Sequence, residues 1–303
     1  MGASPLFPPQ HEKAEEAKQA ILLILRRCPS QFNHQRSRWT LSMLMQSCEW
    51  LDVTTEGGMS QILKRLHISY KRGRDYVHSP DPDYEQKRKL IKQVQERCQA
   101  DPERFVFLYQ DELTYYRQPT LACAYEAAGH QQPLAQRSHR SNTAHRIVAA
   151  MNGVTGQVTY RQRSHTDTKC LSAFWYDLRQ AYADAEIIYV VLDNWPVHFH
   201  PDVLAPFQAQ DLPWPPKLPA NWPKEPCAKV TQDNLPIQLL CLPTYASWLN
   251  PIEKLWRWLK QDILHLHRLS DDWPVLNQQV AQFLNKFGQG SPELLRYTGL
   301  LPP

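Results

Sequence analysis

Residues 104–112 read RFVFLYQDE, an apolar run that ends in two acids. Its aromatic and aliphatic residues, bounded by charge, predict a strand buried on both faces. A second run, IIYVVL at 187–192, predicts another such strand and leads directly into Asp193. In open α/β sheets, groups just beyond the carboxyl ends of strands converge in a crevice, so Asp111 and Asp193 can be neighbours there. The alternative is that each aspartate only begins a turn, which is the commoner role for either residue alone.

The segment LPTYASWLNPIEKLWRWLK, residues 242–260, supplies a third carboxylate in Glu253. Asn250 is a good N-cap residue and a proline follows it, so Glu253 occupies the third position of a predicted helix and can complete a capping box. Helical spacing also places Glu253, Arg257 and Lys260 together on one flank. The flank is therefore either a surface ion pair or an acid that faces a metal ion beside two cations that face phosphate.

Three acidic side chains packed together raise each other's pKa values unless a divalent cation lies among them. Ligation by carboxylates alone favours Mg²⁺ or Mn²⁺ over zinc. Two such ions can activate a water or hydroxyl nucleophile and stabilise the leaving oxygen at phosphorus. If Asp111, Asp193 and Glu253 meet, the chemistry they indicate is the cutting or joining of phosphodiesters, with two Mg²⁺ or Mn²⁺ ions as cofactors.

The C-terminal two thirds of the chain predicts an α/β domain that starts near residue 101. Beyond the two apolar runs, we expect strands at 146–151, 157–161 and 237–242 and helices at 167–183, 251–264 and 272–287. This order indicates a mixed sheet flanked by helices. Residues 206–236 hold eight of the 25 prolines, which excludes a central strand or a regular helix there and predicts an extended insertion.

The N-terminal third carries the positive charge. Residues 1–100 contain 16 Lys and Arg against 11 Asp and Glu, whereas the whole chain of 303 residues has a net charge of +4. This asymmetry suggests an anionic partner such as nucleic acid, although clustered charge is often only a solvated face.

Helical spacing in this third predicts helices at residues 14–28, from Leu41 to Cys48 and from Met59 to Leu66, with Gly57 and Gly58 in the turn between the last two. Residues 36–79 are thus compatible with a helix-turn-helix and wing that bind double-stranded DNA. The side chains expected to contact DNA are Ser60, Gln61, Lys64 and Arg65 on the second helix and Lys71, Arg72 and Arg74 on the wing. The alternative is an ordinary helical hairpin with a basic exterior. Residues 80–100, with Asp81 as the expected N-cap, predict a polar helix that links two domains.

Several other functions are disfavoured by what the sequence lacks. Its longest apolar run has six residues, too few for a membrane helix, and its start does not resemble a secretory signal, so we expect a cytoplasmic protein. The seven cysteines are scattered singly, which predicts reduced thiols and no structural zinc. A small-substrate hydrolase that uses His198 or His200 with Asp193 is a weak alternative, because no nucleophile motif accompanies the histidines.

Five motifs resemble those of the DDE transposases of the Tc/mariner superfamily, in their bacterial insertion-sequence branch. They are Q-D-E at 110–112, V-L-D-N at 191–194 with His198 following, the segment 242–260, SPDPDYEQK at 79–87, and Trp39, Thr40 and Leu41 before the DNA-binding helices. The likeness covers about residues 36–287, and the surroundings of Glu253 are its most diagnostic part.

The resemblance implies a ribonuclease-H-like catalytic domain over residues 101–303, with Asp111, Asp193 and Glu253 as catalytic metal ligands. In such enzymes a metal-activated water hydrolyses DNA at each element end, and the freed 3′-hydroxyl attacks target DNA. The resemblance also implies that the helix-turn-helix reads terminal inverted repeats and that a homodimer or higher synaptic assembly holds both ends. For a bacterial element, it places the protein in the cytoplasm at the nucleoid.

Two features depart from the family pattern. The interval from Asp193 to Glu253 is longer than usual, and the excess coincides with the insertion at 206–236. Relatives commonly carry two helix-turn-helix units, whereas residues 1–35 offer one helix, which we interpret as a remnant of a first unit. A catalytically inactive, transposase-derived DNA-binding protein is therefore the alternative to an active transposase.

Overall fold

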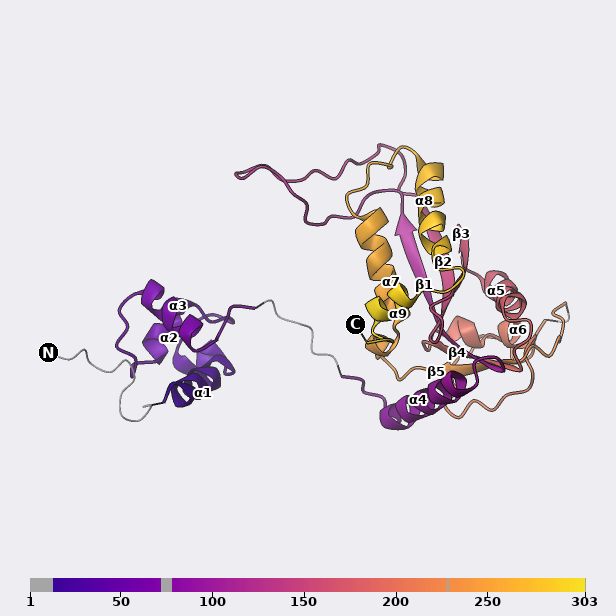
Figure 1. The fold of residues 1–303 in the computed structure, drawn as a ribbon, viewed down its shortest axis with the longest axis horizontal. Coiled ribbons are helices and arrows are strands. Elements are labelled where there is room, and N and C mark those ends of the chain that lie inside the picture. Colours follow the sequence, from indigo (N-terminus) through magenta and orange to yellow (C-terminus); the bar gives the residue numbers. More distant parts are fainter. Residues whose placement is uncertain (1–12, 72–77, 228, 303) are drawn as a thin grey trace. The chain divides into compact units, whose positions relative to one another are not determined.

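The computed structural model describes residues 13–71, 78–227 and 229–302. The chain forms two compact units, Met1–Tyr76 and Val77–Pro303 (Figure 1). This division differs from the one expected from the sequence, because residues 80–100 belong to the second unit and not to a separate linker.

The N-terminal unit packs three helices around one small core. They are α1 (Ala14–Leu25), α2 (Leu41–Ser47) and α3 (Glu56–Arg65), with a 3-10 turn at Pro29–Phe32. The buried apolar residues come from all three helices and their connections: Ala17, Ile21, Leu44, Cys48, Leu51, Met59, Ile62 and Leu66. Because α1 shares this core, it belongs to the same unit as α2 and α3, and residues 1–35 are not set apart from residues 36–79 as the sequence suggested.

The second helix of the expected helix-turn-helix begins earlier than its apolar spacing indicated. Thr55 is the N-cap of α3, and its hydroxyl accepts a hydrogen bond from the Gly58 N–H at 3.1 Å. Gly57 and Gly58 therefore lie in the first turn of α3 and not between the helices, which corrects the prediction from the sequence. Of the expected wing, Lys71 is exposed, whereas Arg72 and Arg74 lie outside the described residues.

The second unit is built on a five-stranded mixed sheet, as predicted. The strands are β1 (Phe105–Tyr116), β2 (Ala144–Asn152), β3 (Val158–Arg163), β4 (Ile187–Leu192) and β5 (Ile237–Cys241). Their order is β3-β2-β1-β4-β5; β2 pairs antiparallel with β1 and β3, and β4 pairs parallel with β1 and β5. The apolar run at 105–110 thus forms the centre of the sheet.

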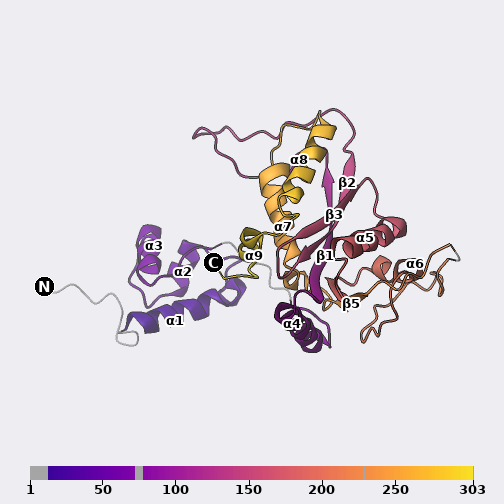
Figure 2. The same cartoon turned by 45° about the vertical axis from the view of Figure 1, so that its right-hand side comes forward.

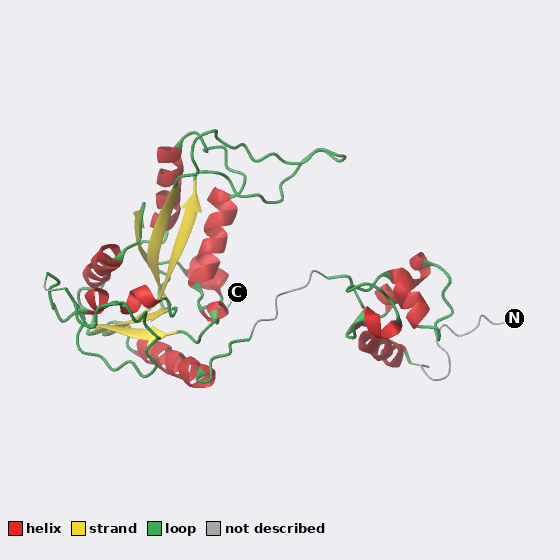
Figure 3. Ribbon diagram, turned by 180° about the vertical axis from the view of Figure 1, so that it is seen from behind, coloured by secondary structure: helices red, strands yellow, loops and turns green. Residues whose placement is uncertain are grey.

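Helices cover both faces of this sheet (Figures 2 and 3). One face packs against α4 (Tyr84–Ala100), α7 (Ile252–Leu259), α8 (Trp273–Asn285) and α9 (Pro292–Thr298). The other face packs against α5 (Thr168–Ala181) and α6 (Pro201–Leu204). Alternate residues of β1 point to the two cores, with Phe107 in the first and Leu108 in the second.

The polar helix expected as a linker is α4, and it is docked on the sheet. Ile91 and Cys98 lie buried in the larger core. The helix begins at Tyr84 after Asp83, so Asp81 is not its N-cap, in contrast to the prediction. Asp81 instead accepts a hydrogen bond from the Asp83 N–H at 2.9 Å and forms an ion pair with Lys87.

The proline-rich insertion at 206–236 is irregular, as expected. Among its described residues the only ladder contact is an isolated bridge between Phe207 and Leu235. None of the helices that the structure describes combines the length and the apolar character required to cross a membrane.

Candidate active site

The sheet register aligns Asp111 with Asp193. Parallel pairing of β1 and β4 ends at Tyr109 opposite Val191, so each aspartate lies two residues beyond the last pair on the same edge. Asp193 directly follows β4, as the sequence indicated, whereas β1 continues past Asp111 to Tyr116 because it pairs with β2 there. Asp111 therefore extends from a strand and not from a turn, which removes the turn-forming alternative for this residue.

Glu253 lies in the first turn of α7, and its capping box does not form. The N-cap of α7 is Pro251, and no side chain caps the helix. The amide of Asn250, the expected cap, donates instead to the Gln110 carbonyl at 3.0 Å in a buried contact. This bond ties the start of the helix that carries Glu253 to the strand residue before Asp111.

The charges of the three acids act on one another. Burial and the negative charges of Glu253 and Glu112 together raise the pKa of Asp111 to about 7, although a hydrogen bond from Trp256 Nε1 at 2.8 Å acts to lower it. Burial and the charge of Asp193 raise the pKa of Glu253, while Lys260 and Arg257 lower it. Each acid is therefore coupled to at least one other, as expected for carboxylates that converge on one place.

A buried histidine joins Asp193 to a fourth acid. The ring of His198 is fully buried, and its Nε2 lies 3.4 Å from Asp193 Oδ1 and 3.5 Å from Glu112 Oε1. Burial works against a charged ring, but the two carboxylates raise the pKa of His198 to about 9. Burial also works against the Asp193 carboxylate, and contacts with His198 and the Trp195 N–H nevertheless lower its pKa.

Reasoning from the sequence gave no role to Glu112 and left that of His198 open. The signal for Glu112 was its place directly after Asp111 in Q-D-E. The other histidine of the H-x-H pair does not join this cluster, because His200 Nδ1 accepts from the Asp202 N–H at 3.2 Å. Of the two histidines that the hydrolase alternative named, His198 therefore lies beside Asp193 and His200 does not.

The acids match a divalent cation in donor type and charge. No three His, Cys, Asp or Glu side chains within the described ranges are gathered tightly enough to form a ready metal cage. Asp111, Asp193 and Glu253 nonetheless offer the oxygen ligands that Mg²⁺ and Mn²⁺ prefer. A cation among them would relieve the repulsion that raises the pKa values of Asp111 and Glu253.

Beside Glu253 lies an open cavity of about 470 Å³ with a cationic lining. Arg257 and Lys260, both exposed, line it together with Trp248 and His265. The structure thus groups the two expected phosphate-binding cations with the third acid. In the other unit, Ser60, Gln61, Lys64 and Arg65 are all on the surface of α3, the arrangement that groove contact requires.

Residues 106–274, more than half of the chain, match the family described as DDE superfamily endonuclease. The chain belongs to this family. The matched range includes β1 except for its first residue, β2 to β5, α7 and all three acids. The expectation that this chain is a DDE enzyme is confirmed.

A curated relative and several solved structures support this assignment. The insertion element IS630 uncharacterized 39 kDa protein of Shigella sonnei is 22% identical over 265 residues, which cover 86% of this chain and 68% of that protein. The Mos1 mariner paired end complex with Mn matches with a TM-score of 0.60 at 16% identity and covers 100% of this chain and 78% of that one. The paired end complex with Mg matches at 0.59 with 14% identity, covering 99% and 78%. The fold is therefore ribonuclease-H-like, as predicted.

Proposed function

We propose that this protein is an active transposase that cuts DNA at the ends of its mobile element and joins the freed 3′-hydroxyl ends to target DNA. The observation that carries the proposal is the electrostatic coupling of Asp111, Asp193 and Glu253 at one edge of the sheet, beside the cations Arg257 and Lys260. A DNA-binding protein without catalysis would have no need to hold three carboxylates in mutual repulsion.

In this proposal Asp111, Asp193 and Glu253 hold two Mg²⁺ or Mn²⁺ ions. Bound there, the ions would activate the attacking oxygen and stabilise the leaving one at phosphorus. Trp256 orients Asp111 through its indole N–H, and His198 holds Asp193 beside Glu112. That two solved Mos1 complexes contain Mn or Mg is consistent with this choice of cofactor.

The remaining groups of this chain bind and align DNA. Arg257 and Lys260 contact phosphates next to the scissile bond. Charge-assisted contacts of this kind position DNA without reading its sequence. In the N-terminal unit, the exposed face of α3 and Lys71 bind the terminal inverted repeats. From the sequence alone, we propose that Arg72 and Arg74 also bind DNA. A homodimer or larger synaptic assembly then holds two ends, as the paired-end Mos1 complexes do.

The test is cleavage of DNA that carries the element's own flanks, incubated with purified protein and Mg²⁺ or Mn²⁺. We expect breaks at the element end with the natural protein and none with Glu253→Gln, which keeps the size of the side chain but removes its charge. Both proteins should retard the DNA equally in a gel. Cleavage that persists in Glu253→Gln would contradict the proposed role of the three acids.

The second candidate is a transposase-derived DNA-binding protein without catalysis. It is favoured by the absence, in the described ranges, of a closed group of metal-ligating side chains. It predicts retarded but uncut DNA for the natural protein, and binding that is indifferent to Asp111→Asn, Asp193→Asn and Glu253→Gln. The same incubation therefore separates the two functions.

A further inference from the structure

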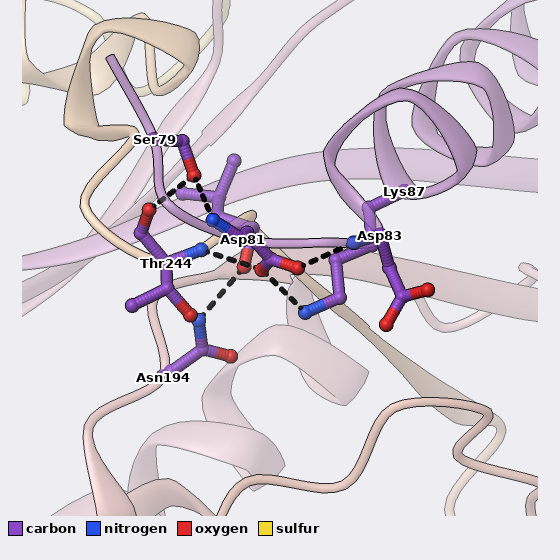
Figure 4. A network of polar contacts seen from close by, with 7 residues as sticks. Ser79, Asp81, Asp83, Lys87, Asn194 and Thr244 are labelled. Atoms are coloured by element: carbon purple, nitrogen blue, oxygen red, sulfur yellow. Dashed lines mark hydrogen bonds and ion pairs between the residues drawn. The ribbon is translucent and has the colours of Figure 1, made fainter.

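The segment that opens the second unit is bonded directly to the loop between β5 and α7 (Figure 4). Oδ2 of Asp81 accepts hydrogen bonds from the Thr244 N–H and from Lys87 Nζ, both at 2.8 Å. Ser79 Oγ donates to the Thr244 carbonyl at 2.5 Å and accepts from the Asp81 N–H at 3.2 Å. Thr244 is therefore held through both its N–H and its carbonyl.

The same loop forms hydrogen bonds with the neighbours of Asp193 and Asp111. At its start, the Leu242 carbonyl accepts a hydrogen bond from the Asn194 amide at 2.8 Å, and Asn194 is the neighbour of Asp193. At its end, Asn250 donates to the Gln110 carbonyl. The contact with Asp81 thus lies between these two hydrogen bonds, and it comes from the segment before α4 and not from β1 or from the residues that follow β4.

The contact between Asp81 and Thr244 lies beside a tight turn and includes a buried ion pair. Tyr245, directly after Thr244, has a φ of 55°, a left-handed conformation that residues with a Cβ rarely adopt, and its side chain is 75% exposed. Tyr245 is the third residue of a turn closed by a hydrogen bond from the Ala246 N–H to the Pro243 carbonyl at 3.1 Å, a position where a positive φ is common. The side chains of Asp81 and Lys87 are only 3% and 8% exposed. Burying an ion pair removes two charges from water, and their attraction often does not offset that loss of solvation. The best-attested use of such a pair is to specify one structural arrangement of the segments it connects.

The proline-rich insertion also contacts this ion pair. Lys87 Nζ lies 5.9 Å from the centre of the Trp214 ring, in the cation–π arrangement. Lys87, on α4, thus contacts the insertion and also Asp81, which is bonded to the loop that leads to Glu253. The insertion therefore places an aromatic ring beside the ion pair.

We propose that Asp81, supported by Lys87 and Ser79, is a positioning residue for the metal site: it fixes Thr244, and with it the path of the loop that sets Glu253 against Asp193. The inference rests on the proposed function, because it takes those acids to bind a divalent cation. Groups that orient metal ligands from outside the ligand set commonly change metal affinity by about 10-fold to 100-fold when they are removed.

The experiment measures Mn²⁺ binding to the full-length protein without DNA, from the electron paramagnetic resonance signal of free Mn²⁺. We expect Asp81→Ala to weaken binding by about 10-fold, at the lower end of the range for outer groups. Hydrogen–deuterium exchange in residues 242–251 should become faster in the same variant. Ser79→Ala, which removes only the Ser79 hydroxyl and its two hydrogen bonds, should give a smaller loss of affinity in the same direction.

The matched control is Asp177→Asn, which breaks the ion pair with Arg161 between α5 and β3. This change should lower the unfolding temperature but leave Mn²⁺ affinity and exchange in 242–251 unaltered. A rescue variant combines Asp81→Asn with Lys87→Met, because the carboxamide oxygen can still accept from the Thr244 N–H and no buried ammonium is left unpaired. We expect its Mn²⁺ affinity to lie closer to that of the natural protein than to that of Asp81→Ala.

Two outcomes separate this inference from the proposed function. If the natural protein binds Mn²⁺ and the folded Ser79→Ala and Asp81→Ala variants bind it equally well, the positioning role is wrong and the metal site stands. Should Asp81→Ala fail to fold, the Ser79→Ala and rescue variants decide in its place. If the natural protein binds no Mn²⁺, or if binding survives Asp111→Asn combined with Asp193→Asn, the proposed function itself fails.

Discussion

Single side chains that touch the acids decide how well the site is prepared for a cation. Trp256 is almost fully buried, and its only polar side-chain atom donates to Asp111. His198 is fully buried between Asp193 and Glu112. A carboxylate that accepts a bond from a fixed donor loses orientational freedom, so both residues favour one arrangement of their partners.

Trp256→Phe tests this orientation at one atom. An aromatic ring stays buried while the N–H to Asp111 is removed, so we expect the single-turnover rate of DNA cleavage to fall about 10-fold with little change in DNA affinity. Trp258→Phe is the matched control, because Trp258 Nε1 donates to Asp262 and not to any of the three acids. Equal rates for the two variants would show that the bond to Asp111 has no part in catalysis.

At the scale of elements, local pattern predicted most of the sheet. β4 has the bounds that its apolar run indicated, and β5 differs by one residue. The start of α7 was misjudged because Asn250 bonds Gln110, a partner 140 residues away that no local pattern reveals. The short helix α9 was missed because seven residues show too little periodicity to be recognised.

The contribution of Asp81, just before the start of α4, to the stability of the fold depends on pH. Burial works against the Asp81 carboxylate, but its bonds from Lys87, Thr244 and Asp83 lower the pKa to about 2, from an ordinary value of 3.8. A pKa that is lower in the folded state stabilises the protein above the unfolded value of 3.8. This contribution disappears as the pH falls from about 4 towards 2.

We therefore expect Asp81→Asn to reduce the free energy of unfolding at pH 6 and to reduce it much less near pH 2, where the natural residue is itself about half protonated. Urea unfolding followed by tryptophan fluorescence at several pH values measures the gap between the two proteins. The gap should narrow steadily below pH 4. A gap of constant size across this range would mean that the charge of Asp81 contributes nothing to stability.

At the scale of the whole molecule, the two units divide the work between recognition and chemistry in the proposed function. The charge asymmetry and the three acids are visible in the sequence, and they suffice to separate a basic helical part from an α/β part. What the sequence could not reveal is that α1 completes the N-terminal core and that α4 completes the other, because both depend on which faces meet in space. Binding and cutting should consequently respond to different substitutions.

The salt dependence of DNA binding tests this division. Removing one cation that binds a phosphate should lower the slope of log affinity against log salt concentration by about 1. We thus expect Lys64→Ala combined with Arg65→Ala to reduce the slope by about 2 and to weaken binding at every salt concentration. Lys18→Ala, on α1 outside the proposed face, should change neither quantity, and Glu253→Gln should leave the slope intact. Fluorescence anisotropy with labelled end DNA measures all of these variants beside the natural protein, and an unaltered slope in the double variant would exclude this face of α3 as the phosphate-binding surface.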